Sequence, residues 1–129
     1  MAIDLAGKVV VITGASSGIG AATAIEAGRA GMRVVLAARR VQLLESVAAQ
    51  VRDAGGEAEV VACDLADDAA IDALFEAAVE RFGRVDVLYA NAGYGFMQRG
   101  DDTAIDDDEA HMWRVNYFAC VRCCRAAAK

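Results

Sequence analysis

The 129-residue sequence lacks an apolar run long enough to cross a bilayer. The longest apolar run near its start, Val9 to Ile12, is far too short. Its first residues, Met1 to Leu5, carry an acid and no basic segment, so no secretory signal is visible. The chain also lacks an excess of positive charge, because 13 Lys and Arg face 19 Asp and Glu and the net charge is −6. We therefore expect a cytoplasmic protein that binds neither nucleic acid nor a membrane, although a local basic pocket for a small anion is compatible with this balance.

The sequence is also poor in groups that bind metals. It has four cysteines and one histidine, and no second Cys-x-x-Cys pair follows the first. Cys63 ends a predicted strand, whereas Cys120, Cys123 and Cys124 fall on a predicted helix. We expect no metal site, and we interpret the cysteines as buried or half-buried thiols in a reducing compartment.

An acidic run precedes and enters the last predicted helix. It consists of Asp101, Asp102, Asp106, Asp107 and Asp108. Acids are favoured in the first turn of a helix by its dipole, so we interpret the run as a solvated helix start rather than a metal site. Glu109 stands three residues after Asp106, at the spacing of a capping box. His111, one turn later, is expected at the surface or at an interface rather than in catalysis.

What the chain does contain is a regular alternation of apolar segments. Apolar residues make up 57% of it and the mean hydropathy is +0.30, which favours strands covered on both faces. The predicted strands are 8–13, 33–38, 57–63 and 85–90, and the predicted helices are 18–30, 41–54, 67–82 and 106 onward. Strands separated by such helices form right-handed crossovers. We predict an α/β fold, a doubly wound, Rossmann-type parallel sheet of four strands with flanking helices, in one domain over residues 1–129.

Apolar residues at helical spacing predict which faces of the second and third helices are buried. These residues are Val41, Leu44, Ala48 and Val51 in the second helix, and Ile71, Leu74, Phe75, Ala78 and Phe82 in the third.

A glycine cluster follows the first predicted strand and opens the first predicted helix. It reads Thr13-Gly14-Ala15-Ser16-Ser17-Gly18-Ile19-Gly20. Glycines at such a junction let the backbone turn sharply and approach a pyrophosphate, while the N–H groups and dipole of the helix start face the phosphates. The spacing is Gly-x-x-x-Gly-x-Gly rather than Gly-x-Gly-x-x-Gly or a P-loop. We interpret the turn as a dinucleotide phosphate site, the alternative being a purely structural turn; the candidate contacts are Gly14, Ser16, Ser17, Gly18, Ile19 and Gly20.

The end of the second predicted strand bears on which dinucleotide would bind. It reads Ala37-Ala38-Arg39-Arg40, with no acid. A carboxylate there would take the ribose 2′-hydroxyl of NAD, whereas a guanidinium holds the 2′-phosphate of NADP through charge-assisted hydrogen bonds. We predict NADP(H) in preference to NAD(H), with Arg39 as the main contact and Arg40 as a secondary one; the alternative is two solvated arginines. A sheet that binds S-adenosylmethionine is a weaker interpretation, because it normally carries an acid at this position.

Four motifs, in order along the chain, resemble those of the short-chain dehydrogenase/reductase family and together cover almost all of it. They are Thr13-Gly14-x-x-x-Gly18-Ile19-Gly20, Cys63-Asp64-Leu65, Ala90-Asn91-Ala92-Gly93 and Trp113-Arg114-Val115-Asn116. The third departs from the Asn-Asn-Ala-Gly of the family, because alanine replaces the first asparagine. The ordered set is much more specific than any one motif.

The resemblance implies cofactor contacts from the second and third motifs. Asp64, followed by Leu65, would accept the adenine amino group, although a carboxylate here is also a common helix N-cap. Asn91, with Ala92, would stabilise the loop beside the nicotinamide-side ribose. Gly93 would let the cofactor lie close to the backbone.

The resemblance also implies a catalytic role for Asn116, which in the family supports a proton-relay water. The alternative is an ordinary packed amide, since the neighbouring Trp113, Tyr117 and Val121 look like packed residues. A buried amide without partners is costly, so in either case we expect Asn116 to bond a backbone group or a water.

The tyrosine and lysine that the family spaces as Tyr-x-x-x-Lys are missing. The tyrosines are Tyr89, Tyr94 and Tyr117, followed four residues later by Gly93, Gln98 and Val121, and the lysines are Lys8 and Lys129. In the family this tyrosine is the general acid/base, and the ammonium lowers its pKa; a later strand carries the serine. We therefore expect these residues alone not to catalyse hydride transfer. We interpret the sequence as cut short within its last helix, which would leave 85–90 as an unpaired edge strand.

Two functions remain open at this point. The first is an NADP(H)-dependent oxidoreductase that moves hydride between the cofactor and a small carbonyl or alcohol substrate. For the full-length protein, the resemblance implies a homodimer or homotetramer formed through the last helix. The alternative is a non-catalytic NADP(H)-binding module or sensor. A continuation past Lys129 containing the serine and Tyr-x-x-x-Lys would favour the enzyme.

Overall fold

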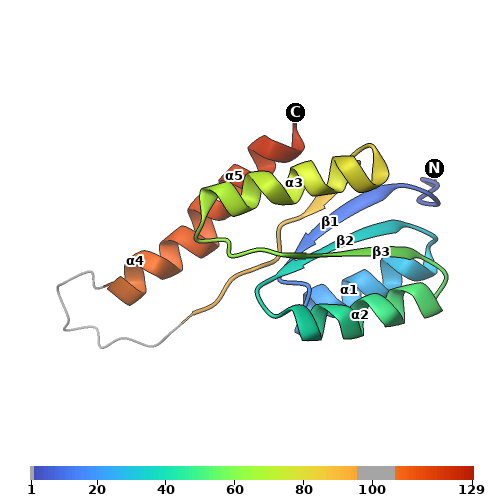
Figure 1. The fold of residues 1–129 in the computed structure, drawn as a ribbon, viewed down its shortest axis with the longest axis horizontal. Coiled ribbons are helices and arrows are strands. Elements are labelled where there is room, and N and C mark those ends of the chain that lie inside the picture. Colours follow the sequence, from blue (N-terminus) through green and yellow to red (C-terminus); the bar gives the residue numbers. More distant parts are fainter. Residues whose placement is uncertain (1, 96–106) are drawn as a thin grey trace.

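A parallel sheet between two layers of helices organises the computed structural model, which describes residues 2–95 and 107–129 (Figure 1). The strands are β1 (Val9–Thr13), β2 (Arg33–Ala38), β3 (Glu57–Ala62) and β4 (Val87–Tyr89). The helices are α1 (Gly18–Arg29), α2 (Val41–Asp53), α3 (Asp68–Phe82), α4 (Asp107–Trp113), the π-helical η1 (Arg114–Phe118) and α5 (Ala119–Ala127). This arrangement confirms the predicted doubly wound α/β fold.

The strand order is β3-β2-β1-β4, so the chain reverses its direction of travel across the sheet at β1. All three strand pairings are parallel, and the register sets Ile12 of β1 beside Leu36 of β2 and Tyr89 of β4. The carboxyl ends of all four strands therefore meet at one edge of the sheet. In open α/β sheets, ligands bind outside this edge, at the point where the strand order reverses.

The two faces of β1 divide the core into two clusters, because successive side chains of a strand point to opposite faces. Val9 and Val11 face α3 and α5, whereas Val10 and Ile12 face α1 and α2. All five residues of β1 are buried, as expected of a strand covered on both faces.

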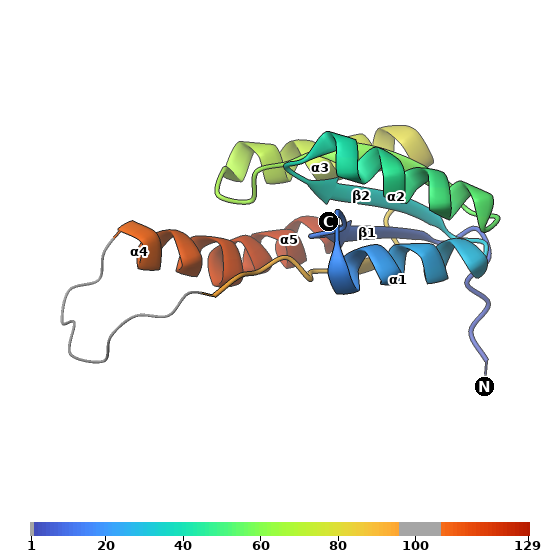
Figure 2. The same cartoon turned by 90° about the horizontal axis from the view of Figure 1, so that it is seen from below.

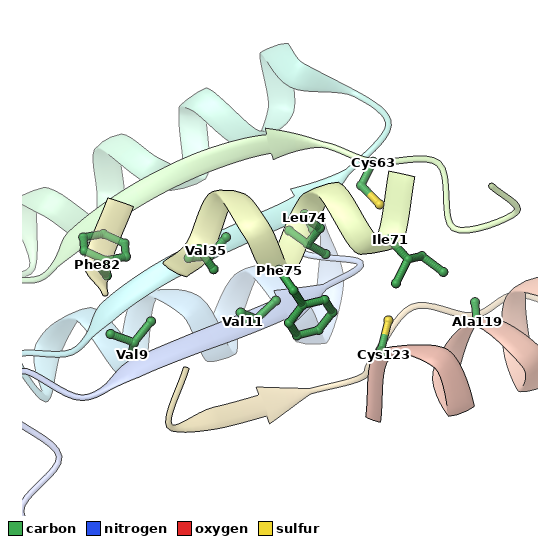
Figure 3. Packing of buried hydrophobic residues seen from close by; sticks show 12 residues of the cluster. Val9, Val11, Val35, Cys63, Ile71, Leu74, Phe75, Phe82, Ala119 and Cys123 are labelled. Carbon is green, nitrogen blue, oxygen red and sulfur yellow. The ribbon is translucent and has the colours of Figure 1, made fainter. Parts of the chain in front are cut away.

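The predicted face of α3 is confirmed, since its five apolar residues are all buried. Figure 3 shows Ile71, Leu74 and Phe75 of this helix packed over the sheet beside Ala119 and Cys123 of α5. The face of α2 differs by one residue: Val41 is exposed in the first turn, and Val47 completes the buried stripe with Leu44, Ala48 and Val51.

Helices α1 and α2 pack closely through a glycine. A Cβ atom on Gly28 would lie 2.8 Å from the carbonyl oxygen of Val51, so the two backbones approach at a distance that only glycine permits. This contact fixes α1 beneath the sheet and hence the direction in which its first turn points.

The last helical run, from α4 through η1 to α5, extends past the sheet (Figures 1 and 2). Only Ala119 and Cys123 of this run are buried among the described residues. Trp113 and Tyr117 are 52% and 53% exposed, so the expectation that they are packed is wrong; Val121 is half-buried. The reason is that the sheet does not extend beneath α4 and η1, and their aromatic side chains pack edge to face on one another instead.

The cysteines follow the predicted pattern with one exception. Cys63 and Cys123 are buried, Cys120 is half-buried, and all four thiols are free, but Cys124 is exposed because it lies on the outer face of α5. None of the helices within the described ranges has both the length and the apolarity needed to cross a bilayer.

The acidic run lies partly outside the described residues. Asp101, Asp102 and Asp106, and with Asp106 the proposed capping box, fall there. Asp107 and Asp108 are exposed in the first turn of α4, the position in which the helix dipole favours acids. In the part of the chain that the structure describes, no three metal-binding side chains come together.

Candidate functional site

A pocket of 470 Å³ opens at the carboxyl ends of the strands. Every strand of the sheet contributes to its wall through the segment that follows it, and α4 and η1 contribute one residue each. The wall consists of Gly14, Ser16, Ser17, Ile19, Ala38, Arg39, Arg40, Cys63, Asp64, Leu65, Asn91, Ala92, Gly93, Tyr94, His111 and Val115. The structure thus brings together all the candidate cofactor contacts except Gly18 and Gly20, which lie in the first turn of α1 on either side of the wall residue Ile19.

The glycine turn between β1 and α1 forms the floor of the pocket. Gly14 has a φ of +65°, and a Cβ there would lie 2.9 Å from the Cα of Ala92. A Cβ on Gly20 would lie only 2.2 Å from the carbonyl oxygen of Gly14. The start of α1 therefore sits directly against the turn, and side chains at these two positions would push apart the turn, α1 and the Asn91–Ala92 segment.

The amino end of α1 is suited to bind an anion. Its N-cap is Ser17, whose side chain makes no capping hydrogen bond within the described residues, and its first turn contains no acid. The first N–H groups of a helix have no partner within the helix, and the helix dipole adds a partial positive charge at this end. A phosphate in the pocket would meet both.

Hydrogen bonds tie the end of β4 to the glycine turn. The buried Thr13 hydroxyl accepts the backbone N–H groups of Asn91 and Ala92, each at 3.1 Å. The side-chain amide of Asn91 donates to the carbonyl oxygens of Thr13 and Gly14 at 3.3 and 3.4 Å. Asn91 thus holds two walls of the pocket together, and its position depends on residues nearly eighty positions earlier in the chain.

Two arginines line the pocket at the end of β2. Arg39 and Arg40 are both exposed, and within residues 2–95 and 107–129 neither guanidinium forms an ion pair. Two uncompensated positive charges at the pocket wall make this part of the site attractive to an anionic group.

Asp64 reaches the pocket wall after β3. Its Oδ1 accepts the backbone N–H of Ala66 at 3.0 Å, which closes a turn. The N-cap of α3 is instead Asp67, which accepts the N–H of Ala69 at 3.0 Å. The alternative interpretation of Asp64 as the helix cap is therefore wrong, because the helix begins one turn later.

Cys63 also lines the pocket but is a poor nucleophile. Burial, followed by the charges of Asp64 and Asp67, raises the pKa of its thiol to about 11. A thiol rather than a thiolate faces the pocket at neutral pH.

Asn116 lies beside the pocket rather than in its wall. Its Oδ1 accepts the backbone N–H of Tyr94 at 3.0 Å, and its Nδ2 donates to the carbonyl oxygen of Tyr94 at 2.6 Å. The expected bond to a backbone group is confirmed, but the amide is exposed rather than packed in a core. It lies in η1, a π-helical segment closed by the bond from the N–H of Ala119 to the carbonyl oxygen of Arg114.

The sequence reasoning missed three residues of the pocket wall beside β4, namely Tyr94, His111 and Val115. The Tyr94 hydroxyl is 2.5 Å from Nδ1 of His111, and the two ring centroids are 5.8 Å apart. His111, which we expected at the surface or at an interface, is half-buried at this wall. The one available signal was that Tyr94 directly follows the Asn91–Gly93 motif.

Comparisons with known proteins agree on one family. The model of the short chain dehydrogenase family matches residues 8–129. A fatty acyl-CoA reductase of Mycobacterium tuberculosis is 40% identical over 98% of this chain, a match that covers 43% of the relative. The chain spans less than half the length of the first curated relatives that it matches.

Solved structures give the same result. A metagenomic short-chain oxidoreductase in complex with NADP superposes with a TM-score of 0.91 at 43% identity, covering 98% of this chain and 57% of the other. An NAD⁺-bound xylitol dehydrogenase superposes with a TM-score of 0.90 at 30% identity, covering 98% and 48%. Similar structures thus hold either nicotinamide dinucleotide.

Proposed function

Because this chain belongs to the short-chain dehydrogenase/reductase family, we propose that its pocket binds NADP(H) and that the protein is an oxidoreductase acting on a small carbonyl or alcohol substrate. The observation that carries the cofactor preference is the pair of arginines at the end of β2, Arg39 and Arg40, which form no ion pair with any residue that the structure describes. A 2′-phosphate there would meet two guanidinium groups and no carboxylate on the same strand end.

The described residues fit such a dinucleotide along the whole edge of the sheet. The turn from Gly14 to Gly20 would hold the pyrophosphate against the first turn of α1, and the glycines allow this turn, α1 and the Asn91–Ala92 segment to pack closely. Asp64 and Leu65 would contact the adenine beside the arginines. On the other side of β1, the segment Asn91–Gly93 would support the nicotinamide half.

When bound, the cofactor would supply or accept a hydride at its nicotinamide ring. This chain's own residues would bind and orient it. In the proposal Asn116 is a positioning residue, because both polar groups of its amide hold the backbone of Tyr94 next to the Asn91–Gly93 segment. The sequence contains no Tyr-x-x-x-Lys pair, so we propose that these 129 residues bind the cofactor without turning it over.

The enzyme is favoured over a non-catalytic NADP(H) sensor because the named relatives are dehydrogenases and reductases. The exposed aromatic residues Trp113, Tyr117 and Phe118 support a homodimer or homotetramer formed through the last helical run. The four free thiols support a reducing compartment, which we propose is the cytoplasm.

The deciding experiment is a calorimetric titration of the chain with NADPH and with NADH. We expect NADPH to bind at least about tenfold more tightly, because hydrogen bonds to a charged group contribute about 1.5–3 kcal/mol. Equal affinities would contradict the NADP(H) preference, and no binding of either would contradict the proposed site.

A further inference from the structure

Tyr94 and His111 form a hydrogen-bonded pair at the β4 end of the pocket, away from the arginines. The order β3-β2-β1-β4 places Asp64 and the arginines on one side of the glycine turn and Tyr94 on the other. If the dinucleotide lies as proposed, its nicotinamide half is the part nearest this pair. We propose that Tyr94 and His111 form a subsite that selects substrates carrying a hydroxyl group near the reacting carbonyl, an inference that rests on the proposed function.

The pair is held in place from both ends. The backbone N–H and carbonyl of Tyr94 are both bonded to the Asn116 amide, at 3.0 and 2.6 Å. Its hydroxyl is bonded to Nδ1 of His111 at 2.5 Å. His111 is itself half-buried in α4, on the same helical run as Asn116. Fixing the polar atoms before a ligand arrives reduces the entropy lost on binding, so these groups are placed for recognition.

The hydrogen-bonding capacity of the pair exceeds what their mutual bond uses. A tyrosine hydroxyl has one donor and two acceptor positions, and a neutral imidazole has one of each. Their mutual bond consumes one donor and one acceptor, which leaves one donor and two acceptors in either ring tautomer. A substrate hydroxyl both donates and accepts, so it matches what remains, whereas a methyl group in its place would bond to neither side chain.

Among residues 2–95 and 107–129, the wall next to this pair is apolar or already bonded, so the pair is the polar feature of this end there. Val115 adds an aliphatic side chain, and the Asn91 amide is bonded to the carbonyl oxygens of Thr13 and Gly14. Discrimination between a hydroxyl and a methyl group in this region would therefore depend on Tyr94 and His111. A ligand hydroxyl would gain hydrogen bonds to this pair that an analogue without it cannot make.

Two ketones of equal heavy-atom number test the subsite, since hydroxyacetone carries a hydroxyl where 2-butanone carries a methyl group. His111 is the only histidine, so its imidazole NMR signals need no assignment. With the chain saturated with NADP⁺, we expect hydroxyacetone to shift these signals and to bind about 2- to 12-fold more tightly than 2-butanone, the ratio that one net hydrogen bond gives. Equal affinities, or no shift with either ketone, would overturn the proposal.

Variants separate a recognition role from a structural one. Tyr94→Phe removes one oxygen atom and keeps both backbone bonds to Asn116, and His111→Phe removes the other partner. With ligand-observed NMR, each is expected to bring the ratio of ketone affinities close to one while NADPH still binds. Tyr89→Phe, on β4 outside the pocket wall, should leave the ratio unchanged. A ratio that persists in both pocket variants would reject the subsite, whereas failure of NADPH to bind the unaltered chain would reject the proposed function instead.

Discussion

The hydroxyl of Thr13 accepts the backbone N–H of Asn91 at 3.1 Å, and through this bond the last residue of β1 holds the segment that follows β4. The same oxygen accepts the N–H of Ala92, also at 3.1 Å. Thr13 is 2% exposed, so water does not replace these bonds when the hydroxyl is removed. One small side chain thus sets the distance between two walls of the pocket.

Replacing Thr13 by valine is expected to lower the free energy of unfolding by about 1–3 kcal/mol and to weaken NADPH binding, because the N–H of Ala92 loses its acceptor, whereas that of Asn91 keeps the carbonyl oxygen of Tyr89 at 3.0 Å. Urea denaturation and calorimetric titration measure the two effects. Thr13→Ser keeps the hydroxyl and is the matched control, expected to retain most of the affinity. If valine and serine behaved alike, the hydroxyl would not be the group that holds this segment.

Alanine substitutions at Gly18 and Gly20 are expected to differ in their effects on stability and on NADPH binding. Gly18 has a φ of +57° but open space where a Cβ would lie, so Gly18→Ala is expected to cost about 1 kcal/mol through backbone strain alone. A Cβ on Gly20 would lie 2.2 Å from the Gly14 oxygen, so Gly20→Ala must displace the turn and should cost more stability and most of the NADPH affinity. Thermal unfolding and calorimetric titration measure stability and affinity. Equal losses in the two variants would contradict the clash expected at Gly20.

Arg39→Ala should weaken NADPH binding by about 1.5–3 kcal/mol, roughly 10- to 150-fold, and change NADH binding little. The reason is that only NADPH carries the 2′-phosphate that the guanidinium would bond. Arg29→Ala is the control for net charge, because Arg29 lies at the far end of α1 and pairs with Glu26. Parallel losses for both cofactors would show that Arg39 acts through general electrostatics.

Alkaline pH should destabilise the fold through its buried thiols. Burial raises the pKa of Cys63 to about 11 and that of Cys123 to about 12, whereas thiols of an unfolded chain ionise near roughly 8.5. The folded state therefore holds more protons between these values, and the free energy of unfolding falls as the pH rises through that window.

Denaturant titrations at several pH values between 8 and about 11 measure this slope. Cys123→Ala should make it shallower, because one of the two titrating thiols is removed. Cys124→Ala, on the exposed side of α5, should leave it as it is. An unchanged slope in Cys123→Ala would mean that other groups cause the alkaline loss.

Most of the fold could be predicted because its signals are local. β-branched runs and helical spacing mark β1 and α3, and the observed ends lie within a few residues of the expected ones. The glycine turn and the arginines were also found, because they directly follow strands. Their convergence on one pocket follows from the parallel arrangement of the sheet.

The parts that could not be predicted depend on where distant segments meet. The exposure of Trp113 and Tyr117 follows from the limited width of the sheet, which no spacing within the helix reveals. The bonds from Tyr94 to His111 and Asn116 join segments 17 and 22 residues apart. Local periodicity contains no information about such contacts.

Because Thr13 at the end of β1 bonds Asn91 after β4, the pocket is complete only when β4 is paired with β1. A ligand that spans the edge from β3 to β4 binds chains in which β4 has docked on β1 and leaves those with a detached β4 unbound. By mass action, a ligand at one hundred times its dissociation constant would stabilise the docked population by about 2.7 kcal/mol. The concentration of such a ligand would then act on how long the folded chain survives, independently of any reaction that the ligand serves.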